Sequence, residues 1–504
     1  MTAHFRQSVG AAILLISSAH MASAQVTAQD VWDDWKGYMV SYGYDVTGSE
    51  SMSGNTLTIS GLTMAMAMPQ NQGSVSIDMQ TLILTGNSDG TVDVTMSGTM
   101  PMHIKGTDGG DEFDVVVNYT QSGNSLVVSG SPKDLNYNYT ASQIGVALAS
   151  LSVAGDTLPE GVARASMTLT NVISSTQMKT GDLRDYSQRM SADSLTYDMA
   201  FDDPESEDGG TFQGSIVGLA FEGSGSIPLD MGTSDLPAML AAGFAFDGVF
   251  DYKSGNSNMT GAGDGEQMTF ASTSQGGRFN VAMDADRIKY DIGQNGTSIS
   301  VTTNQLPFPV DMQMAESRIL VNVPVSKSDE EQDFSFILKM RDFTISDMIW
   351  GMVDPGAVLP RDPATVVLDL SGKAKVLVDY MDPNIAENMP DVPGELNALT
   401  INELLVSAAG AKLSGTGDFT FDNSDLASFD GIPAPTGAAN LELSGANGLM
   451  DKLIQMGLMS DSDAMGARMM MGMLAVPGDG EDTLKSKIEI NGEGQIMANG
   501  QRIK

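Results

Sequence analysis

Over most of its length the chain alternates apolar and polar residues in short runs that are separated by turn-forming residues. Residues 55–60, 91–96 and 287–292 are examples of such runs, and glycine, asparagine and aspartate lie between runs, as at positions 86–90. Alternation with a period of two predicts antiparallel strands with one face buried and the other in water. The regular succession of strand and helix that a parallel α/β fold requires is missing. The sequence therefore predicts a mainly β fold, a large antiparallel sheet structure that is either a sealed sandwich or an open sheet, curved or groove-forming.

A few peripheral helices interrupt the predicted sheet. Residues 27–43 begin with Thr27 and Asp30, the pattern of an N-terminal capping box, and carry apolar residues at helical spacing. Toward the C-terminus, residues 447–457 and 460–473 each begin with a capping residue and carry an apolar face, which predicts an αα-hairpin. Shorter helices are predicted at residues 142–151, 236–242 and 347–353.

Two stretches of sequence recur in the same order. Residues 97–102 resemble residues 224–229, and residues 113–125 resemble residues 246–257. A true duplication predicts two similar β units in series, whereas chance similarity between hairpin-rich segments does not. The predicted organisation is a signal peptide (1–24), an N-terminal helix with a first β unit (25–190), a second β unit (191–345), and a C-terminal region with strands and the αα-hairpin (346–504).

The N-terminus has the three parts of a secretory signal peptide. Arg6 is basic, residues 9–16 are apolar and residues 22–24 are Ala-Ser-Ala, which predicts cleavage between Ala24 and Gln25. The apolar run is too short to cross a bilayer, and no later run approaches the ~20 apolar residues that a membrane helix needs. The sequence predicts a periplasmic or secreted protein with no transmembrane segment in the mature chain.

The composition excludes several functional classes. The 504 residues include no cysteine, three histidines, and 64 acidic against 26 basic residues, for a formal net charge of −38. Without cysteine the chain has no disulfide, no thiolate–metal site and no thiol nucleophile. The negative charge opposes binding to nucleic acid, because such proteins place lysine and arginine on the phosphates.

No catalytic, metal or cofactor site is predicted. Residues 86–90 match the G-x-S-x-G pattern of serine hydrolases, but the runs on either side predict a hairpin rather than the strand–turn–helix that the mechanism needs. His103 is the one histidine that remains after the predicted cleavage, so a zinc or copper site built on several imidazoles is excluded. Acidic runs at residues 202–208 and 329–331 predict solvated loops, with Ca²⁺ binding as the alternative.

Methionine is the unusual enrichment, with 36 residues. One group of methionines alternates along a single predicted strand, and a second group lies on the predicted C-terminal hairpin. Thioethers bind Cu(I), but without accompanying histidines the pattern favours an irregular core or an adaptable apolar groove. The candidate groove residues, in the role of apolar contacts, are Met64, Met66, Met68, Leu449, Leu453, Met469 and Met473.

The C-terminal part of the chain carries a recognisable pattern. Residues 413–421, 431–437 and 441–445 form glycine-punctuated strands, preceded by Trp350 and the proline-rich residues 359–363. The whole resembles an uncharacterised alphaproteobacterial family of exported proteins, a domain-of-unknown-function group, and is distantly similar to the AsmA-type envelope proteins. The second resemblance implies a long curved sheet with an apolar groove. Neither implies a catalytic residue, and unlike AsmA-type proteins this chain is predicted to keep no membrane anchor.

These observations predict an exported, non-enzymatic protein of the cell envelope that holds a lipid or another apolar molecule in a β groove. Its partner is then a lipid or an envelope component, without nucleic acid or cofactor. The alternative is an exported structural or adhesive acidic β-protein, with or without Ca²⁺. A carboxylate-based hydrolase ranks third, because no pair of acidic residues is singled out.

Overall fold

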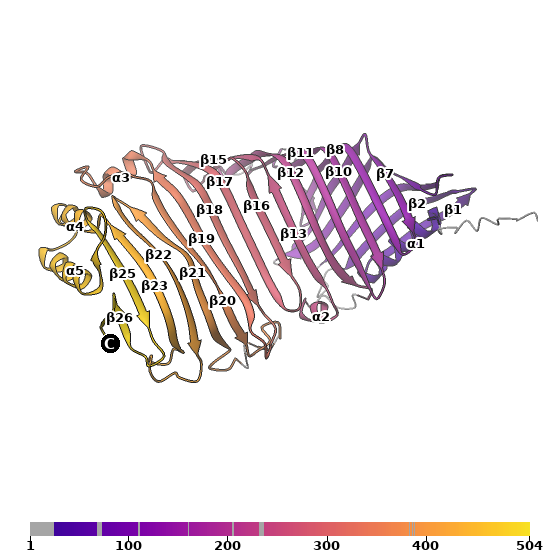
Figure 1. Cartoon of the computed structure of the whole chain (residues 1–504). Coiled ribbons are helices and arrows are strands. Elements are labelled where there is room, and N and C mark those ends of the chain that lie inside the picture. The colour runs from indigo at the N-terminus through magenta and orange to yellow at the C-terminus, as the bar shows by residue number, and fades with distance from the viewer. Residues whose placement is uncertain are drawn as a thin grey trace, which may run out of the picture.

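The computed structural model describes residues 25–67, 73–108, 111–159, 161–203, 206–230, 236–382, 384–385, 387 and 389–504. The predicted signal peptide (residues 1–24) and Met68 lie outside these ranges. The described residues form one large antiparallel sheet of 27 strands, accompanied by a few helices (Figure 1). No helix in this part of the chain is long and apolar enough to cross a bilayer. The predicted fold class, mainly β with a C-terminal helical hairpin, is confirmed.

The helices are α1 (Ala28–Ser41), α2 (Leu236–Ala241), α3 (Asp347–Val353), α4 (Ala446–Gln455) and α5 (Asp461–Leu474). The strands are β1 (Asp45–Ser53), β2 (Thr56–Ala67), β3 (Gly73–Gly86), β4 (Val92–Met96), β5 (Thr99–Asp108), β6 (Asp111–Ser122), β7 (Ser125–Ser131), β8 (Asp134–Val153), β9 (Asp156–Thr157), β10 (Ala163–Thr180), β11 (Leu183–Asp202), β12 (Gly209–Pro228), β13 (Ala245–Tyr252), β14 (Ser254–Gly263), β15 (Glu266–Ser274), β16 (Gly277–Met283), β17 (Arg287–Thr303), β18 (Val310–Pro324), β19 (Gln332–Ile345), β20 (Ala364–Val376), β21 (Gly394–Ala408), β22 (Ala411–Asp422), β23 (Ala434–Ser444), β24 (Val476–Pro477), β25 (Thr483–Ile490), β26 (Ile496–Ala498) and β27 (Gln501–Arg502).

Strands that are neighbours in the sheet are mostly neighbours in the chain, so the sheet is an up-and-down meander. In four places two consecutive short strands lie end to end and together pair like one long strand: β4 with β5, β6 with β7, β13 with β14, and β15 with β16. For example, β12 pairs with β14 through residues 209–217 and with β13 through residues 220–226. The short turns predicted from the sequence make these antiparallel connections, as at residues 86–90 between β3 and β4.

A line of breaks crosses the long strands near their middles. Where β11 pairs with β12, for instance, the pairing passes from Ala192–Leu219 to Ser194–Val217 and skips the residues between. A residue in the left-handed region turns a strand sharply. Seven residues along this line have φ between +50° and +118°, namely Gly61, Gly123, Asn171, Gly218, Gly276, Gly296 and Asp342.

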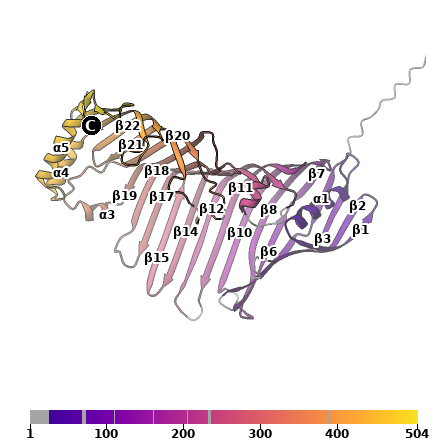
Figure 2. The same cartoon turned by 90° about the horizontal axis from the view of Figure 1, so that it is seen from below.

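We call this line the crease, because the sheet is folded along it into two leaves. The first leaf contains β4, β7, β13 and β16, the second contains β5, β6, β14 and β15, and the long strands cross from one to the other. In Figure 2 the second leaf lies with its broad side toward the viewer, and α1 lies at one end of the fold. The face of the sheet inside this fold is called the inner face below.

Gly61 tests the crease, because its φ of +60° is left-handed and a Cβ there would meet nothing within 4 Å. We expect Gly61→Ala to lower the free energy of unfolding by about 1–2 kcal/mol, the cost of a Cβ in the left-handed region. Gly261→Ala is the matched control, because Gly261 also has open space around it but no left-handed φ. Urea denaturation of both variants measures the difference, and equal effects would contradict a conformational role for Gly61.

The main hydrophobic core lies where α1 packs on the inner face at the N-terminal end. Val31 and Trp32 of α1 are buried against Leu57 of β2 and against Leu82 and Leu84 of β3. The predicted helix and its Thr27–Asp30 capping box are confirmed. A second, smaller cluster lies along the crease and consists of Ala141, Val172, Ala192 and Leu219.

One predicted helix is wrong. Residues 142–151 belong to β8, which is held in the sheet by β6 on one side and β10 on the other. A short apolar run fits either a strand or a helix, and here pairing on both sides decides for the strand. The helices predicted at residues 236–242 and 347–353 are confirmed as α2 and α3, and Ser460 caps α5 as expected. The domain boundaries at residues 190 and 345 stay predictions.

Candidate functional site

The inner face of the first leaf carries an unbroken apolar row. On ten neighbouring strands, from β12 to β23, one residue lies directly opposite the next, and nine of the ten have apolar side chains. At about 4.8 Å per strand the row is about 40 Å long. It consists of Phe221, Phe250, Phe279, Ile292, Ile319, Leu338, Leu368, Leu404, Gly415 and Leu441.

A parallel row and a row on the second leaf extend this apolar face. The parallel row lies two residues along each strand, or three on β21 where the register shifts, and it continues onto β25. It consists of Val281, Tyr290, Val321, Phe336, Leu370, Ile401, Gly417, Ala439 and Ile488. The row on the second leaf consists of Ala165, Met199, Phe212, Met259, Phe270, Val301 and Val310. The crease cluster joins the two leaves, because Met190 and Phe250 of the first leaf and Leu195 and Ile216 of the second all pack against it.

Much of this apolar face is open to solvent. Phe279 is 43 % exposed, Ile292 46 % and Ile319 52 %, although they are large side chains in the middle of a sheet. Contiguous exposed apolar surface of this kind is rare on soluble proteins and marks a binding surface. The inner face is therefore our candidate functional site.

The outer face of the same strands carries ion pairs between strands. Arg318 donates two hydrogen bonds of 2.8 Å to the carboxylate of Asp291, and this contact lowers the pKa of Asp291. Arg341 bonds both oxygens of Glu403 at 2.9 Å. Apolar side chains of the outer face such as Leu320 and Val367 are buried, whereas Phe279, Ile292 and Ile319 of the inner face are exposed.

At the N-terminal end, α1 is fixed to the inner face by a buried ion pair. Arg184 of β11, which is 8 % exposed, bonds the carboxylate of Asp34, and the Tyr137 hydroxyl donates to the same carboxylate at 3.3 Å. Trp35 donates from Nε1 to the Tyr137 oxygen at 3.2 Å, and the Arg184 guanidinium lies 4.9 Å from the ring centroid of Tyr38. Burial raises the pKa of the Asp34 carboxyl, although Arg184 acts in the opposite direction. The helix therefore closes this end of the inner face.

The predicted groove residues lie at opposite ends of the sheet. Met64 is partly buried against the N-terminal core and Met66 is half-buried on the same strand, whereas Met68 lies outside the described residues. In the C-terminal hairpin, the side chains on α4 are half-buried and those on α5 point into solvent. These hairpin residues are Leu449 and Leu453 on α4, and Met469 and Met473 on α5. The structure does not bring the two groups together (Figure 1).

The residues of the apolar rows were missed by sequence reasoning. Each row residue is one apolar position in an alternating strand, such as Ile292 or Ile319, and nothing distinguishes it from its neighbours two residues away. The row could be found from the sequence by combining the alternation within each strand with the register of each hairpin. When consecutive strands are paired through their short turns, the apolar positions of the row lie opposite one another.

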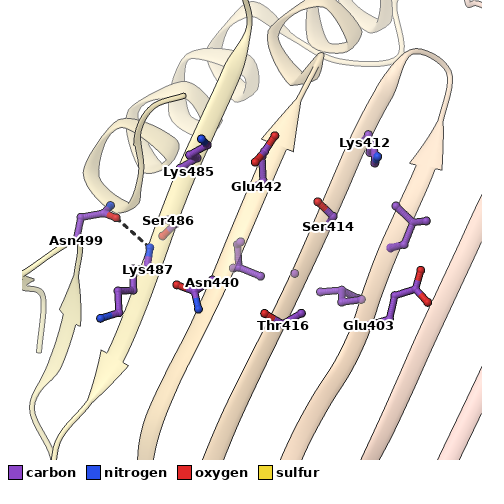
Figure 3. Close-up of a pocket in the computed structure, with 14 residues that line it drawn as sticks. Glu403, Lys412, Ser414, Thr416, Asn440, Glu442, Lys485, Ser486, Lys487 and Asn499 are labelled. Carbon is purple, nitrogen blue, oxygen red and sulfur yellow. Dashed lines mark hydrogen bonds between the residues drawn. The ribbon is translucent and has the colours of Figure 1, made fainter. Parts of the chain in front are cut away.

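Apart from the inner face, the structure has a hollow over β21, β22, β23 and β25 with a volume of about 520 Å³ (Figure 3). Lys412, Lys485 and Lys487 line it together with Glu403 and Glu442. The Lys487 ammonium lies 2.6 Å from Glu489, Lys485 pairs with Asp479, and Glu403 is bonded to Arg341. Most of these charged side chains already form ion pairs within the protein. The hollow is therefore a weaker candidate for a binding site than the inner face.

The residues considered for chemistry are scattered. His103 lies on β5 with Nε2 3.6 Å from Asp78 Oδ2, and residues 86–90 form the turn between β3 and β4. Within the described ranges, no group of three or more histidine, aspartate or glutamate residues is arranged to hold a metal ion. Residues 204–205 of the first acidic run lie outside those ranges.

No protein-family model, curated protein or solved structure matches this chain. The resemblances drawn from the sequence stay predictions. Function is therefore inferred from the geometry of the inner face.

Proposed function

We propose that the protein is an exported, non-enzymatic component of the cell envelope that binds a lipid or another apolar molecule along its inner face. The observation that carries the proposal is the exposed apolar row of the first leaf, in particular Phe279, Ile292 and Ile319. Covering such side chains is favourable by roughly 25 cal/mol for each Å² removed from water. A bound apolar molecule supplies that cover.

The dimensions of the row suit lipid tails. A single lipid leaflet is about 15 Å deep, half of the roughly 30 Å hydrocarbon core of a bilayer. The row of about 40 Å therefore accommodates an extended tail at any point between β12 and β23. Methionine, phenylalanine and isoleucine along the rows offer shape but no fixed hydrogen bonds, which favours a ligand class over one particular molecule.

Export and the distant similarity to AsmA-type proteins support the same proposal. The predicted signal peptide would direct the chain to the envelope, where lipids are available, and the similarity implies a long sheet with an apolar groove. The alternative, a structural or adhesive acidic β-protein, assigns no use to the exposed apolar rows. We therefore prefer the lipid-binding function.

Purification from native envelopes tests the proposal. We expect lipid to co-purify with the protein at about one molecule or more per chain, as detected by native mass spectrometry and by lipid extraction. Added lysophospholipid should raise the melting temperature of delipidated protein, because a ligand that binds only the folded state stabilises it. Protein that carries no lipid and does not respond to lysophospholipid, but melts earlier with a calcium chelator, would favour the structural alternative instead.

A further inference from the structure

The helical hairpin at the C-terminal end exposes a stripe of methionines. Met465, Met469 and Met473 lie four residues apart on α5 and are 70 %, 68 % and 64 % exposed. The opposite side of α5 packs on α4, and Ala464 on that side of α5 is fully buried. A helix that is apolar on both sides is normally covered on both sides. One side of α5 is covered by α4, and the other faces solvent.

A second helix exposes apolar residues at the same end of the molecule. Met348, Met352 and Val353 of α3 are all more than half exposed. Both views place α3 at the end of the sheet that carries α4 and α5 (Figures 1 and 2). We call the six residues Met348, Met352, Val353, Met465, Met469 and Met473 the methionine end.

Charge distinguishes the C-terminal region, which includes α4 and α5, from the rest of the chain. Residues 446–504 contain six basic and eight acidic residues, a net charge of −2, whereas the other 445 residues carry −36. Four of the six basic residues are Lys485, Lys487, Arg502 and Lys504, close to the C-terminus. An anionic headgroup surface repels the acidic body of the protein, but it repels residues 446–504 much less.

The apolar row of the inner face leads to the same place. It ends at Leu441 on β23, and β23 runs through Gly445 directly into α4. Ser486 of β25 donates to the backbone oxygen of Leu474 at 2.6 Å, which ties α5 to the last strands of the sheet. The other end of the inner face is closed by α1, so exchange of an apolar ligand is least hindered beside the methionine end.

We propose that the methionine end docks on the surface of a lipid bilayer, with α5 lying in the interface and its methionines among the acyl chains. This inference rests on the proposed function, since it names the place where the inner face takes up or delivers its lipid. Helices that lie in the interface bind through buried apolar area, and three exposed methionines on one side of α5 provide it. A second copy of the chain is the other occupant to be tested.

Vesicle flotation with the full mature chain and phosphatidylcholine–phosphatidylethanolamine vesicles tests the docking. We expect the wild-type protein to float with the vesicles and the triple variant M465Q/M469Q/M473Q to lose roughly 1000-fold in partition coefficient, because each of the three methionines contributes a factor of about ten when buried. Glutamine keeps the helix propensity of methionine, so circular dichroism and the melting temperature should stay unchanged. The matched control V40Q/M52Q replaces two residues that are 55 % and 51 % exposed at the opposite end, and it should float like wild type.

Three outcomes would overturn the docking. They are equal flotation of the triple variant and the wild type, equal loss in the control, and a wild-type protein that forms dimers through α5 in light scattering without binding vesicles. Co-purified lipid, measured in the same samples, separates this failure from that of the proposed function. A protein that carries lipid but does not float disproves the docking alone, and one that floats but carries no lipid disproves the lipid-binding inner face alone.

Discussion

Replacing Arg184 by methionine should lower the free energy of unfolding by about 3–5 kcal/mol, because it leaves the carboxylate of Asp34 buried without its cation. The side chains of both residues are only 10 % exposed, so water cannot replace the lost partner. The Tyr137 hydroxyl, which bonds the same carboxylate, remains but carries no charge. We expect α1 to detach first, and a red shift of tryptophan fluorescence from Trp32 and Trp35 in urea should report it.

Arg189 provides a matched control on the same strand. Its ion pair with Glu222 is exposed, with 82 % and 69 % of the two side chains open to solvent. Exposed pairs contribute about 0–1 kcal/mol, so Arg189→Met should be nearly neutral. A loss of equal size in the two variants would contradict the role given to the buried pair.

The pH dependence of Arg184→Met checks the electrostatic cause. Without the guanidinium, the pKa of Asp34 should rise above its already raised folded-state value. A carboxyl whose pKa is higher in the folded state costs stability at neutral pH, and the cost disappears as the pH falls and the group is protonated. The deficit of Arg184→Met relative to wild type should therefore shrink between pH 7 and about pH 4.5. In the double variant R184M/D34L, the deficit should show no such dependence on pH.

The sequence predicts the strands well and their bending poorly. Alternation and turn residues identify an antiparallel sheet, and capping patterns identify α1 and the C-terminal hairpin, because these signals are local. The crease depends on left-handed residues inside long strands. Asn171 and Asp342 adopt φ of +50° and +53° there, yet in the sequence they resemble any turn residue.

The candidate site shows the same limit at longer range. The methionine enrichment predicts groove residues around Met64 and on α5, but these lie at opposite ends of the sheet. The apolar row arises only when ten strands are aligned, and a slip of one residue in any pair would move the rest of the row to the other face. Composition could therefore indicate an apolar binding function, but not the residues that form the surface.

The closed and open ends give the inner face a direction. At one end the buried contacts of α1 cover the apolar surface of β2 and β3, and at the other the rows reach the last long strands beside an exposed helical hairpin. Between them, large side chains such as Ile292 and Ile319 stay half exposed. If lipid binds along this face, a charged side chain placed midway should prevent lipid binding there. The packing of α1 and of the C-terminal hairpin should stay unchanged.

The double variant Ile292→Lys with Ile319→Lys should reduce co-purified lipid by about 100-fold. Each ammonium would have to be buried against a lipid tail or displace it, at a cost of more than the 1.4 kcal/mol that corresponds to a factor of ten. Folding should be preserved, because both positions are half exposed and the lysines can reach water. Ile173→Lys is the matched control: this isoleucine is 60 % exposed but lies on the outer face, next to Val172 of the crease cluster. Native mass spectrometry should find full lipid occupancy in the control and almost none in the double variant, whereas equal occupancy in the two would place the lipid elsewhere than on the inner face.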